Sequence, residues 1–295
     1  MSRLYEALRR AERERRQLGA MAPEPAAASL KAEESANADP ATAQKRRLVN
    51  FEIPLESRLV ALTEPFGLGA EKFRILAARL ENLRKKQKDL KSLQVTSGVI
   101  GEGKTLITGN LGLTFAKCSR SKVLLIEGDL HCPKLAAVFG LSPLPGVTDW
   151  WSGAKRDIQH SLYQLQDLPL WFLLAGGTHE QPSEILQSPR FAEAFAQFSR
   201  QFDWIVVDST PMLPAVDANL WSRLVDGTML VVREGVAPLK SLKSGLQSLD
   251  RPKLIGVVVN DASEFDQIDY GEQYTGLGKT RRATRSEDAV IRGRS

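Results

Sequence analysis

The chain has 295 residues, a net charge of +5 and 42% hydrophobic residues, which is typical of a globular protein with a sizeable core. It has no run of 18 uncharged apolar residues, and its start, MSRLYEALRRAERERR, lacks the apolar stretch of a signal peptide. We therefore expect neither a membrane-spanning helix nor secretion. Cys118 and Cys132 lie in no CxxC or Cys/His cluster, which excludes a disulfide scaffold and predicts reduced thiols in a cytosolic protein.

The positive charge is concentrated at the two ends of the chain. Residues 1–16 carry six arginines against three glutamates, and residues 278–295 carry six basic residues against two acidic ones, so the rest is nearly neutral. A nucleic-acid partner is not expected, because the part that would fold is not basic. The charged ends could meet an anionic membrane surface or an acidic partner, or they could be solvated tails, and both interpretations stay open.

In chain order, the first predicted element is a helix over residues 1–16, with an apolar stripe too narrow for a core. Residues 20–45 are rich in Ala, Pro, Glu and Ser and predict a linker, after which helical spacing resumes over 69–88. Strands and helices then alternate. We expect strands over 92–98, 122–129, 168–177, 203–209, 227–234 and 253–260, and helices over 104–118, 189–202, 215–225 and 239–249.

Apolar strands that alternate with helices indicate an α/β fold with a parallel sheet covered on both faces, and ligands at the carboxyl ends of the strands. The expected division of the chain is an N-terminal helix (1–18), a flexible linker (19–48), one α/β domain (49–262) and a mobile basic tail (263–295).

A glycine-rich segment, GVIGEGKT (98–105), fits the pattern GxxxxGK[ST] and lies between a predicted strand and a predicted helix. Glycines at this spacing allow backbone N–H groups to point inward, and the start of the helix adds the positive end of its dipole. We expect Lys104 to reach nucleotide phosphates and Thr105 to bind Mg²⁺. The nucleotide-binding residues expected in this stretch are Gly98, Gly101, Glu102, Gly103, Lys104, Thr105 and Leu106.

Carboxylates follow two of the other predicted strands. Glu127 and Asp129 end VLLIEGD, and Asp208 ends IVVD. Because the carboxyl ends of parallel strands meet at one sheet edge, these acids should converge near the glycine-rich loop, where a metal bound to a triphosphate needs them. The alternative is that each is a turn or cap residue.

Taken together, these segments resemble the bacterial tyrosine kinase (BY-kinase) family, the autokinases of capsule and exopolysaccharide assembly. TSGVIGEGKT (96–105) is similar to the Walker A motif of the family, VLLIEGDLHCPKL (123–135) to its Walker A′ and DWIVVDSTP (203–211) to its Walker B. The start, MSRLYEALRRAE (1–12), is similar to exopolysaccharide-associated members. The resemblance implies a three-layer P-loop NTPase fold with a mostly parallel central sheet, and an ATP-dependent protein-tyrosine autokinase.

For the reaction, the resemblance implies that Lys104 binds and polarises the phosphates of ATP. Thr105, Glu127 and Asp208 would hold Mg²⁺ and its waters, and Asp129 would accept the proton of the attacking tyrosine. Phosphoryl transfer needs positioning and charge neutralisation more than covalent chemistry, so a P-loop with a few acids could supply it.

Further expectations follow from the same resemblance. Asn260 would touch the adenine of ATP or ADP, and Tyr270 and Tyr274 are the candidate phosphate acceptors. Homo-oligomerisation would use Glu71 and Arg74. The expected partner is the cytosolic segment of a membrane polysaccharide co-polymerase, which would recruit a cytoplasmic protein to the inner face of the membrane.

The chain departs from the family pattern at four positions. It has Glu127 where an aspartate is usual, His131 for an arginine, Ile100 for a proline, and Ala77 for the last arginine of the oligomerisation pattern.

Two other functions stay open. A partition-type P-loop ATPase switch would share the fold, although such proteins usually carry a second lysine early in the loop, where this chain has Val99. A nucleotide-binding regulator of polysaccharide assembly, with weakened catalysis, is the other alternative.

Overall fold

The computed structural model describes residues 47–49, 57–154, 157–213, 216–248 and 253–262. The chain divides into two compact units, Met1–Gln44 and Lys45–Ser295, and all the described residues belong to the second. The expected N-terminal helix and the tail with Tyr270 and Tyr274 lie outside the described residues. Within these ranges, no helix is both long and apolar enough to cross a membrane.

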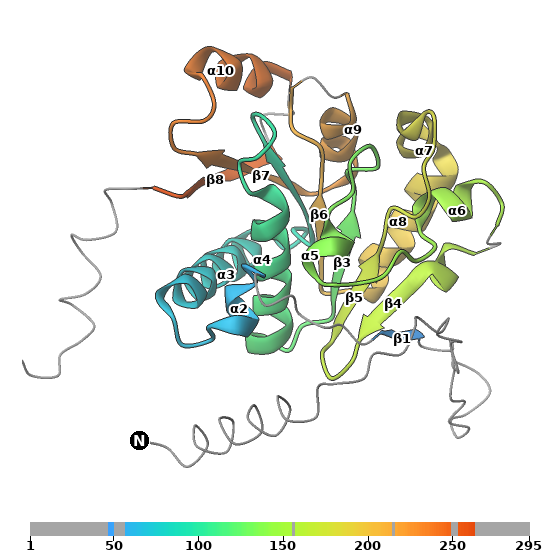
Figure 1. The fold of residues 1–295 in the computed structure, drawn as a ribbon, viewed down its shortest axis with the longest axis horizontal. Coiled ribbons are helices and arrows are strands. Elements are labelled where there is room, and N and C mark those ends of the chain that lie inside the picture. The colour runs from blue at the N-terminus through green and yellow to red at the C-terminus, as the bar shows by residue number, and fades with distance from the viewer. Residues whose placement is uncertain (1–46, 50–56, 155–156, 214–215, 249–252, 263–295) are drawn as a thin grey trace, which may run out of the picture. The chain divides into compact units, whose positions relative to one another are not determined.

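The described residues form one sheet of eight strands in the order β1-β4-β5-β3-β6-β2-β7-β8 (Figure 1). All neighbouring strands are parallel except β4 and β5, which confirms the mostly parallel α/β fold. The strands are β1 (Arg47–Val49), β2 (Ser92–Ser97), β3 (Val123–Glu127), β4 (Leu162–Leu165), β5 (Leu170–Leu173), β6 (Trp204–Asp208), β7 (Gly227–Arg233) and β8 (Leu254–Asn260).

Helices cover both faces of the sheet (Figure 1). They are α2 (Val60–Thr63), α3 (Leu68–Lys86), α4 (Lys104–Cys118), α5 (Leu135–Val138), α6 (Val147–Trp151), α7 (Pro182–Gln187), α8 (Pro189–Gln201), α9 (Asp217–Leu224) and α10 (Leu239–Ser248), with a 3₁₀ turn at Ile158–Ser161. The sequence pattern does not predict α2, α5, α6, α7, β1 or β4, because elements of three to six residues are too short to show a hydrophobic period. Arg47 and Leu48, expected in the linker, belong to β1.

Alternate residues of the central strands enter two different hydrophobic cores. On β3, Val123 and Leu125 pack in the core that α3 and α4 cover, whereas Leu124 and Ile126 pack in the core beneath α6 to α9. Both faces are therefore apolar, which explains the uninterrupted apolar strands in the sequence. The same alternation directs the last residues of β3 and β6, Glu127 and Asp208, to the α4 face, where they are register partners.

The strand order reverses at β2, which has β6 on one side and β7 on the other. From β2 the chain enters the glycine-rich loop and then α4, while β6 leads through α9 to β7. A reversal of this kind opens a crevice at the carboxyl ends of the strands, and it brings the loop beside the acidic ends of β3 and β6.

Candidate functional site

The glycine-rich loop between β2 and α4 has the backbone of a phosphate cradle. Gly101 and Gly103 have φ values of +89° and +99°, a region that side-chain-bearing residues rarely adopt. A Cβ on Gly103 would also lie 2.3 Å from Asn260 Nδ2, whereas one on Gly101 would meet nothing within 4 Å. The loop precedes the amino end of the 15-residue α4, whose free N–H groups and dipole favour an anion.

A buried glutamate holds this loop from within. Glu102 has no exposed surface, and its carboxylate accepts hydrogen bonds from Val99 N at 2.9 Å and from Arg233 N, at the end of β7, at 3.2 Å. Asn260 Nδ2, at the end of β8, donates to the Glu102 carbonyl at 2.8 Å. The Glu102 side chain and the Asn260 amide therefore brace the loop against β7 and β8, and the adenine contact of Asn260 stays a prediction.

The first residue of α4 reaches the acid that follows β3. Lys104 Nζ lies 3.1 Å from Asp129 Oδ2, and the two side chains are only 12% and 7% exposed. Asp129 Oδ1 accepts a hydrogen bond from Cys132 N at 3.0 Å. The expected phosphate-binding lysine and the expected proton acceptor thus lie in direct contact beside the loop.

Asp208, the last residue of β6, is buried and without partners. Among the residues that the structure describes, no donor has full hydrogen-bond geometry to either of its carboxylate oxygens, and the Thr105 hydroxyl is the side-chain donor near enough to act on its pKa. Burial raises the pKa of Asp208 from 3.8 to about 7, opposed by the Lys104 charge and the nearby Thr105 hydroxyl and reinforced by Asp129 and Glu127. A buried carboxylate with two empty oxygens is costly unless a cation or a proton joins it.

Glu127, the register partner of Asp208 on β3, has the opposite environment. It is 2% exposed, its Oε1 accepts from Ala136 N on α5 at 3.1 Å, and its Oε2 accepts from Ala175 N, just beyond β5, at 3.0 Å. Both oxygens are therefore occupied by backbone amides of the protein itself. The metal role expected for Glu127 stays a prediction, and the case for a metal rests on Asp208 and Thr105.

The donor set fits Mg²⁺ held jointly with a nucleotide. The described residues contain no group of three or more His, Cys, Asp or Glu side chains that could hold a metal alone. Mg²⁺ is commonly bound by one or two protein oxygens together with substrate phosphates and waters. The unpartnered oxygens of Asp208 beside Thr105 match that requirement, and the glycine cradle next to them matches the phosphates.

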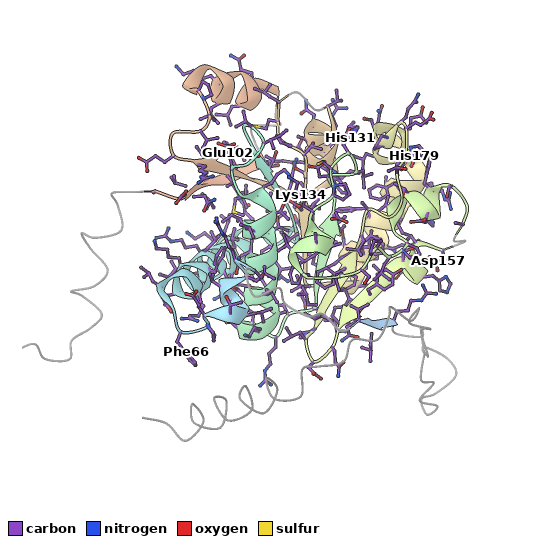
Figure 2. The ribbon with its side chains drawn as sticks, in the orientation of Figure 1. Phe66, Glu102, His131, Lys134, Asp157 and His179 are labelled. Atoms are coloured by element: carbon purple, nitrogen blue, oxygen red, sulfur yellow. The ribbon has the colours of Figure 1, made fainter. Side chains whose placement is uncertain are left out.

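Other expected residues lie elsewhere. On α3, Arg74 Nε donates to Glu71 at 2.7 Å and Arg74 Nη1 donates to the Pro65 carbonyl at 2.8 Å, so the two candidate oligomerisation residues pair with each other. Ala77 is buried, while Phe66, just before α3, is 98% exposed. Figure 2 shows Glu102 and His131 at the end of the fold where α4 begins, and Phe66 near the other end.

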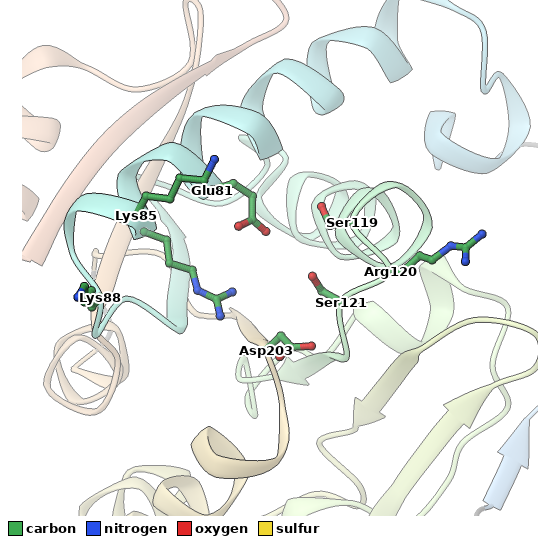
Figure 3. Close-up of a pocket in the computed structure, with 8 residues that line it drawn as sticks. Glu81, Lys85, Lys88, Ser119, Arg120, Ser121 and Asp203 are labelled. Carbon is green, nitrogen blue, oxygen red and sulfur yellow. The ribbon is translucent and has the colours of Figure 1, made fainter.

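A cavity of about 580 Å³ lies at the opposite ends of the strands from the cradle (Figure 3). Its lining comes from the end of α3, the turn between α4 and β3, and the residue before β6: Glu81, Arg84, Lys85, Lys88, Ser119, Arg120, Ser121 and Asp203. None of the expected site residues lines it. Backbone amides of the cradle suit phosphates.

Two residues of the site region are not predicted by the sequence. Asp217, the first residue of α9, lies 2.9 Å from His131 Nε2 and accepts a hydrogen bond from the Ser183 hydroxyl at 2.5 Å. Asp217 had a weak signal, because it is an acid that opens a helix shortly after the Walker B segment. Ser183 had none, because its helix, α7, has six residues.

Known proteins similar to this chain include bacterial tyrosine kinases. The tyrosine-protein kinase CpsD of Streptococcus pneumoniae serotype 4 is 32% identical over 174 residues, which are 58% of this chain and 76% of CpsD. The succinoglycan biosynthesis transport protein ExoP of Rhizobium meliloti is 30% identical over 62% of this chain and 24% of its own length.

Among solved structures, the BceF tyrosine kinase domain superimposes with a TM-score of 0.62 and 25% identity, over 68% of this chain and 81% of that domain. No family model matches the sequence. With the cradle, its lysine and the strand-end acids in the arrangement described above, the chain belongs to the bacterial tyrosine kinase family.

Proposed function

We propose that this tyrosine kinase transfers the γ-phosphate of ATP to tyrosines of its own tail, Tyr270 and Tyr274, and thereby regulates capsule or exopolysaccharide synthesis. One observation carries the proposal for the site: Asp208 presents two unpartnered carboxylate oxygens beside a P-loop whose Lys104 already contacts Asp129. Relatives named as tyrosine kinases support the reaction, and ExoP, named for succinoglycan biosynthesis and transport, supports the process.

The loop and the start of α4 bind the triphosphate in this proposal. Backbone N–H groups of residues 98–105 and the helix dipole favour its negative charge, and Lys104 adds a full positive charge. Asp208 and the Thr105 hydroxyl hold Mg²⁺, which when bound neutralises charge on the phosphate oxygens. Glu102 and Asn260 keep the loop in the receptive shape without touching the reacting atoms.

Asp129 is the group proposed to move the proton. The acceptor hydroxyl oxygen forms the new bond to phosphorus, its proton passes to the Asp129 carboxylate, and ADP is the leaving group. The contact with Lys104 positions Oδ2 of the Asp129 carboxylate, and the hydrogen bond from Cys132 N positions Oδ1. A base held by two contacts needs little rearrangement when substrate binds.

The proposal is tested by incubating the purified full chain with ATP and Mg²⁺ and mapping phosphopeptides by mass spectrometry. We expect phosphotyrosine at Tyr270 or Tyr274, none in Lys104→Met, and loss of the matching peptide in Tyr270→Phe or Tyr274→Phe. A folded wild-type chain that hydrolyses or binds ATP but never yields phosphotyrosine would contradict the proposal.

The partner that we propose is the cytosolic segment of a membrane polysaccharide co-polymerase, and we propose that the kinase acts as a homo-oligomer. The support is that ExoP, a transport protein about four times as long as the region matched here, includes a region similar to this chain. Adding a co-polymerase segment to the purified chain should raise the rate of phosphotyrosine formation. No rise, and no co-purification of the two, would oppose this part.

A further inference from the structure

Helix α9 contacts the loop that carries Asp129 at two points, one on each side of that residue. Trp221 Nε1 donates a hydrogen bond to the Gly128 carbonyl at 3.0 Å, and Asp217 Oδ2 lies 2.9 Å from His131 Nε2. Asp217 and Trp221 are one turn apart, so they lie on the same face of α9. The backbone before Asp129 and the side chain two residues after it are therefore both tied to one helix.

The first tie leaves the loop no room to move toward the helix. A Cβ on Gly128 would lie 2.9 Å from the indole of Trp221 and 2.6 Å from Val207. Trp221 is fully buried and packs edge-to-face against Phe191 and Phe195 of α8. Gly128 is thus closely packed against the buried side chains of Trp221 and Val207.

The second tie depends on a buried acid. The Asp217 side chain is 2% exposed, whereas that of His131 is 53% exposed. Asp217 Oδ1 accepts the Ser183 hydroxyl, whereas Oδ2 accepts no hydrogen bond among the described residues and has His131 Nε2 at 2.9 Å. Leaving such an oxygen unpaired is costly, so the contact with His131 draws the exposed histidine, and the loop with it, toward α9.

The helix that makes these ties is itself held at both ends. Gln94 Nε2, from β2, donates to the Ala218 carbonyl at 2.8 Å. At the other end, Lys253 Nζ donates to the carbonyls of Ser222, Arg223 and Val225 at 3.0, 3.0 and 2.8 Å. A lysine over the last carbonyls of a helix satisfies groups that otherwise lack partners. α9 is therefore a firm support for the loop.

We propose that Asp217 is a positioning residue for phosphoryl transfer, which acts through His131 to place the Asp129 carboxylate beside Lys104. In this proposal Asp217 acts through His131, without contact to the nucleotide or the acceptor tyrosine. The inference rests on the proposed role of Asp129, and it predicts that loss of the Asp217–His131 contact slows transfer without weakening nucleotide binding.

The test compares Asp217→Asn, His131→Ala and His131→Arg in the full chain. Asparagine keeps an oxygen that can accept from Ser183 but removes the charge, and arginine can restore a nitrogen near Asp217. Two quantities are measured for each: the rate of phosphotyrosine formation at saturating ATP and Mg²⁺, and the Kd for Mg²⁺-ADP. We expect Asp217→Asn and His131→Ala to slow transfer by about 10-fold or more with Kd unchanged within about 2-fold.

The conservative variant and the double variant sharpen the result. His131→Arg should recover most of the rate that His131→Ala loses, and the double variant Asp217→Asn/His131→Ala should be no slower than either single variant, because both remove the same contact. His160→Ala, at an exposed histidine of the 3₁₀ turn, is the matched control and should leave both quantities unchanged. His131→Ala keeps the test valid if Asp217→Asn does not fold, since His131 is on the surface.

Several outcomes would overturn the inference. These are an unchanged rate in His131→Ala, a rate loss matched by an equal rise in Kd, additive losses in the double variant, or no recovery with His131→Arg. Failure of the proposed function gives a different pattern, because wild type and Asp129→Asn would then form phosphotyrosine at the same rate, or not at all.

Discussion

The neighbouring strands β3 and β6 each end in an acid. The two acids follow similar apolar runs in the sequence, but their hydrogen bonding in the structure differs. Glu127 and Asp208 are register partners on the same face of the sheet, and both are almost completely buried. Both oxygens of Glu127 accept backbone N–H groups, whereas neither oxygen of Asp208 has a partner among the described residues. The hydrogen bonds of Glu127 are completed within the protein, whereas the oxygens of Asp208 are available to a cation.

The contrast between Glu127 and Asp208 shows which features of a strand-end acid indicate function. A carboxylate that completes its hydrogen bonds within the protein stabilises the fold, and removing it leaves orphaned donors. A carboxylate that the fold buries without partners costs stability, and that cost is offset only when a cation or a proton joins it. Replacing the carboxyl by an amide at pH 8 should therefore raise the stability of the folded protein at Asp208 and lower it at Glu127.

The largest expected effect is on catalysis at Asp208. Asp208→Asn removes the charge proposed to hold Mg²⁺, and we expect phosphotyrosine formation to fall by about 10³-fold. The measurement is the initial rate at saturating ATP and Mg²⁺, with Asp89→Asn, an exposed acid before β2, as the matched control. A rate within about 10-fold of wild type would show that Asp208 does not hold the metal.

The second effect is a pH dependence of stability in the absence of nucleotide. Because the pKa of Asp208 is raised to about 7 in the folded protein, the folded state holds this proton more tightly than the unfolded state does. Stability should therefore fall as the pH rises from about 4 to about 7, by at most about 4 kcal/mol, and stay low above that. Urea denaturation at pH 5 and pH 8 measures it.

Asp208→Asn isolates this contribution from those of all other groups. The variant should exceed wild type in stability most at pH 8, by less at pH 5, and hardly at all near pH 4, because the loss of wild-type stability is spread over the interval from about pH 4 to about pH 7. A variant less stable than wild type at pH 8 would mean that Asp208 has partners in the folded protein.

The third effect is a loss of stability at Glu127. In Glu127→Gln an amide N–H₂ faces a backbone N–H, which should lower the free energy of unfolding by about 1–3 kcal/mol at pH 8. Glu127→Asp has a shorter side chain but keeps two charged acceptor oxygens, so its loss of stability should be smaller. Urea denaturation of both variants gives the values, with the exposed Glu184→Gln as control. If Glu127→Gln were as stable as wild type, the two backbone contacts would not hold in solution.

The smallest effect is expected at a third strand end, that of β8. Asn260→Ala removes the hydrogen bond to the Glu102 carbonyl, so the loop should loosen and the Kd for nucleotide should rise about 3- to 10-fold. If Asn260 acts on the loop alone, ADP and GDP should weaken equally in calorimetric titrations. A loss confined to ADP would favour the adenine contact implied by the family resemblance.

The fold and the centre of the site could be predicted from the sequence because they depend on long, regular segments. β2, α4, β3 and β6 are apolar runs with clear ends, and the rule that parallel strands present their carboxyl ends together is enough to bring Lys104, Asp129 and Asp208 to one place.

The partners of these residues could not be predicted, because they belong to segments without a period. Glu127 accepts from Ala136 and Ala175, which lie on the four-residue α5 and on the loop after β5. Asp217 pairs with His131 and Ser183, which come from a loop and from the short α7. Contacts of this kind depend on how irregular segments pack, and side-chain spacing along the chain does not encode it.

The most direct measurement is the Kd for ADP with and without Mg²⁺, determined by calorimetry at pH 8 for wild type, Asp208→Asn and Glu127→Gln. We expect Mg²⁺ to tighten ADP binding by about 10-fold or more in wild type and in folded Glu127→Gln, and to have little effect in Asp208→Asn. Full tightening in Asp208→Asn, or its loss only in Glu127→Gln, would contradict the assignment of the metal to the end of β6.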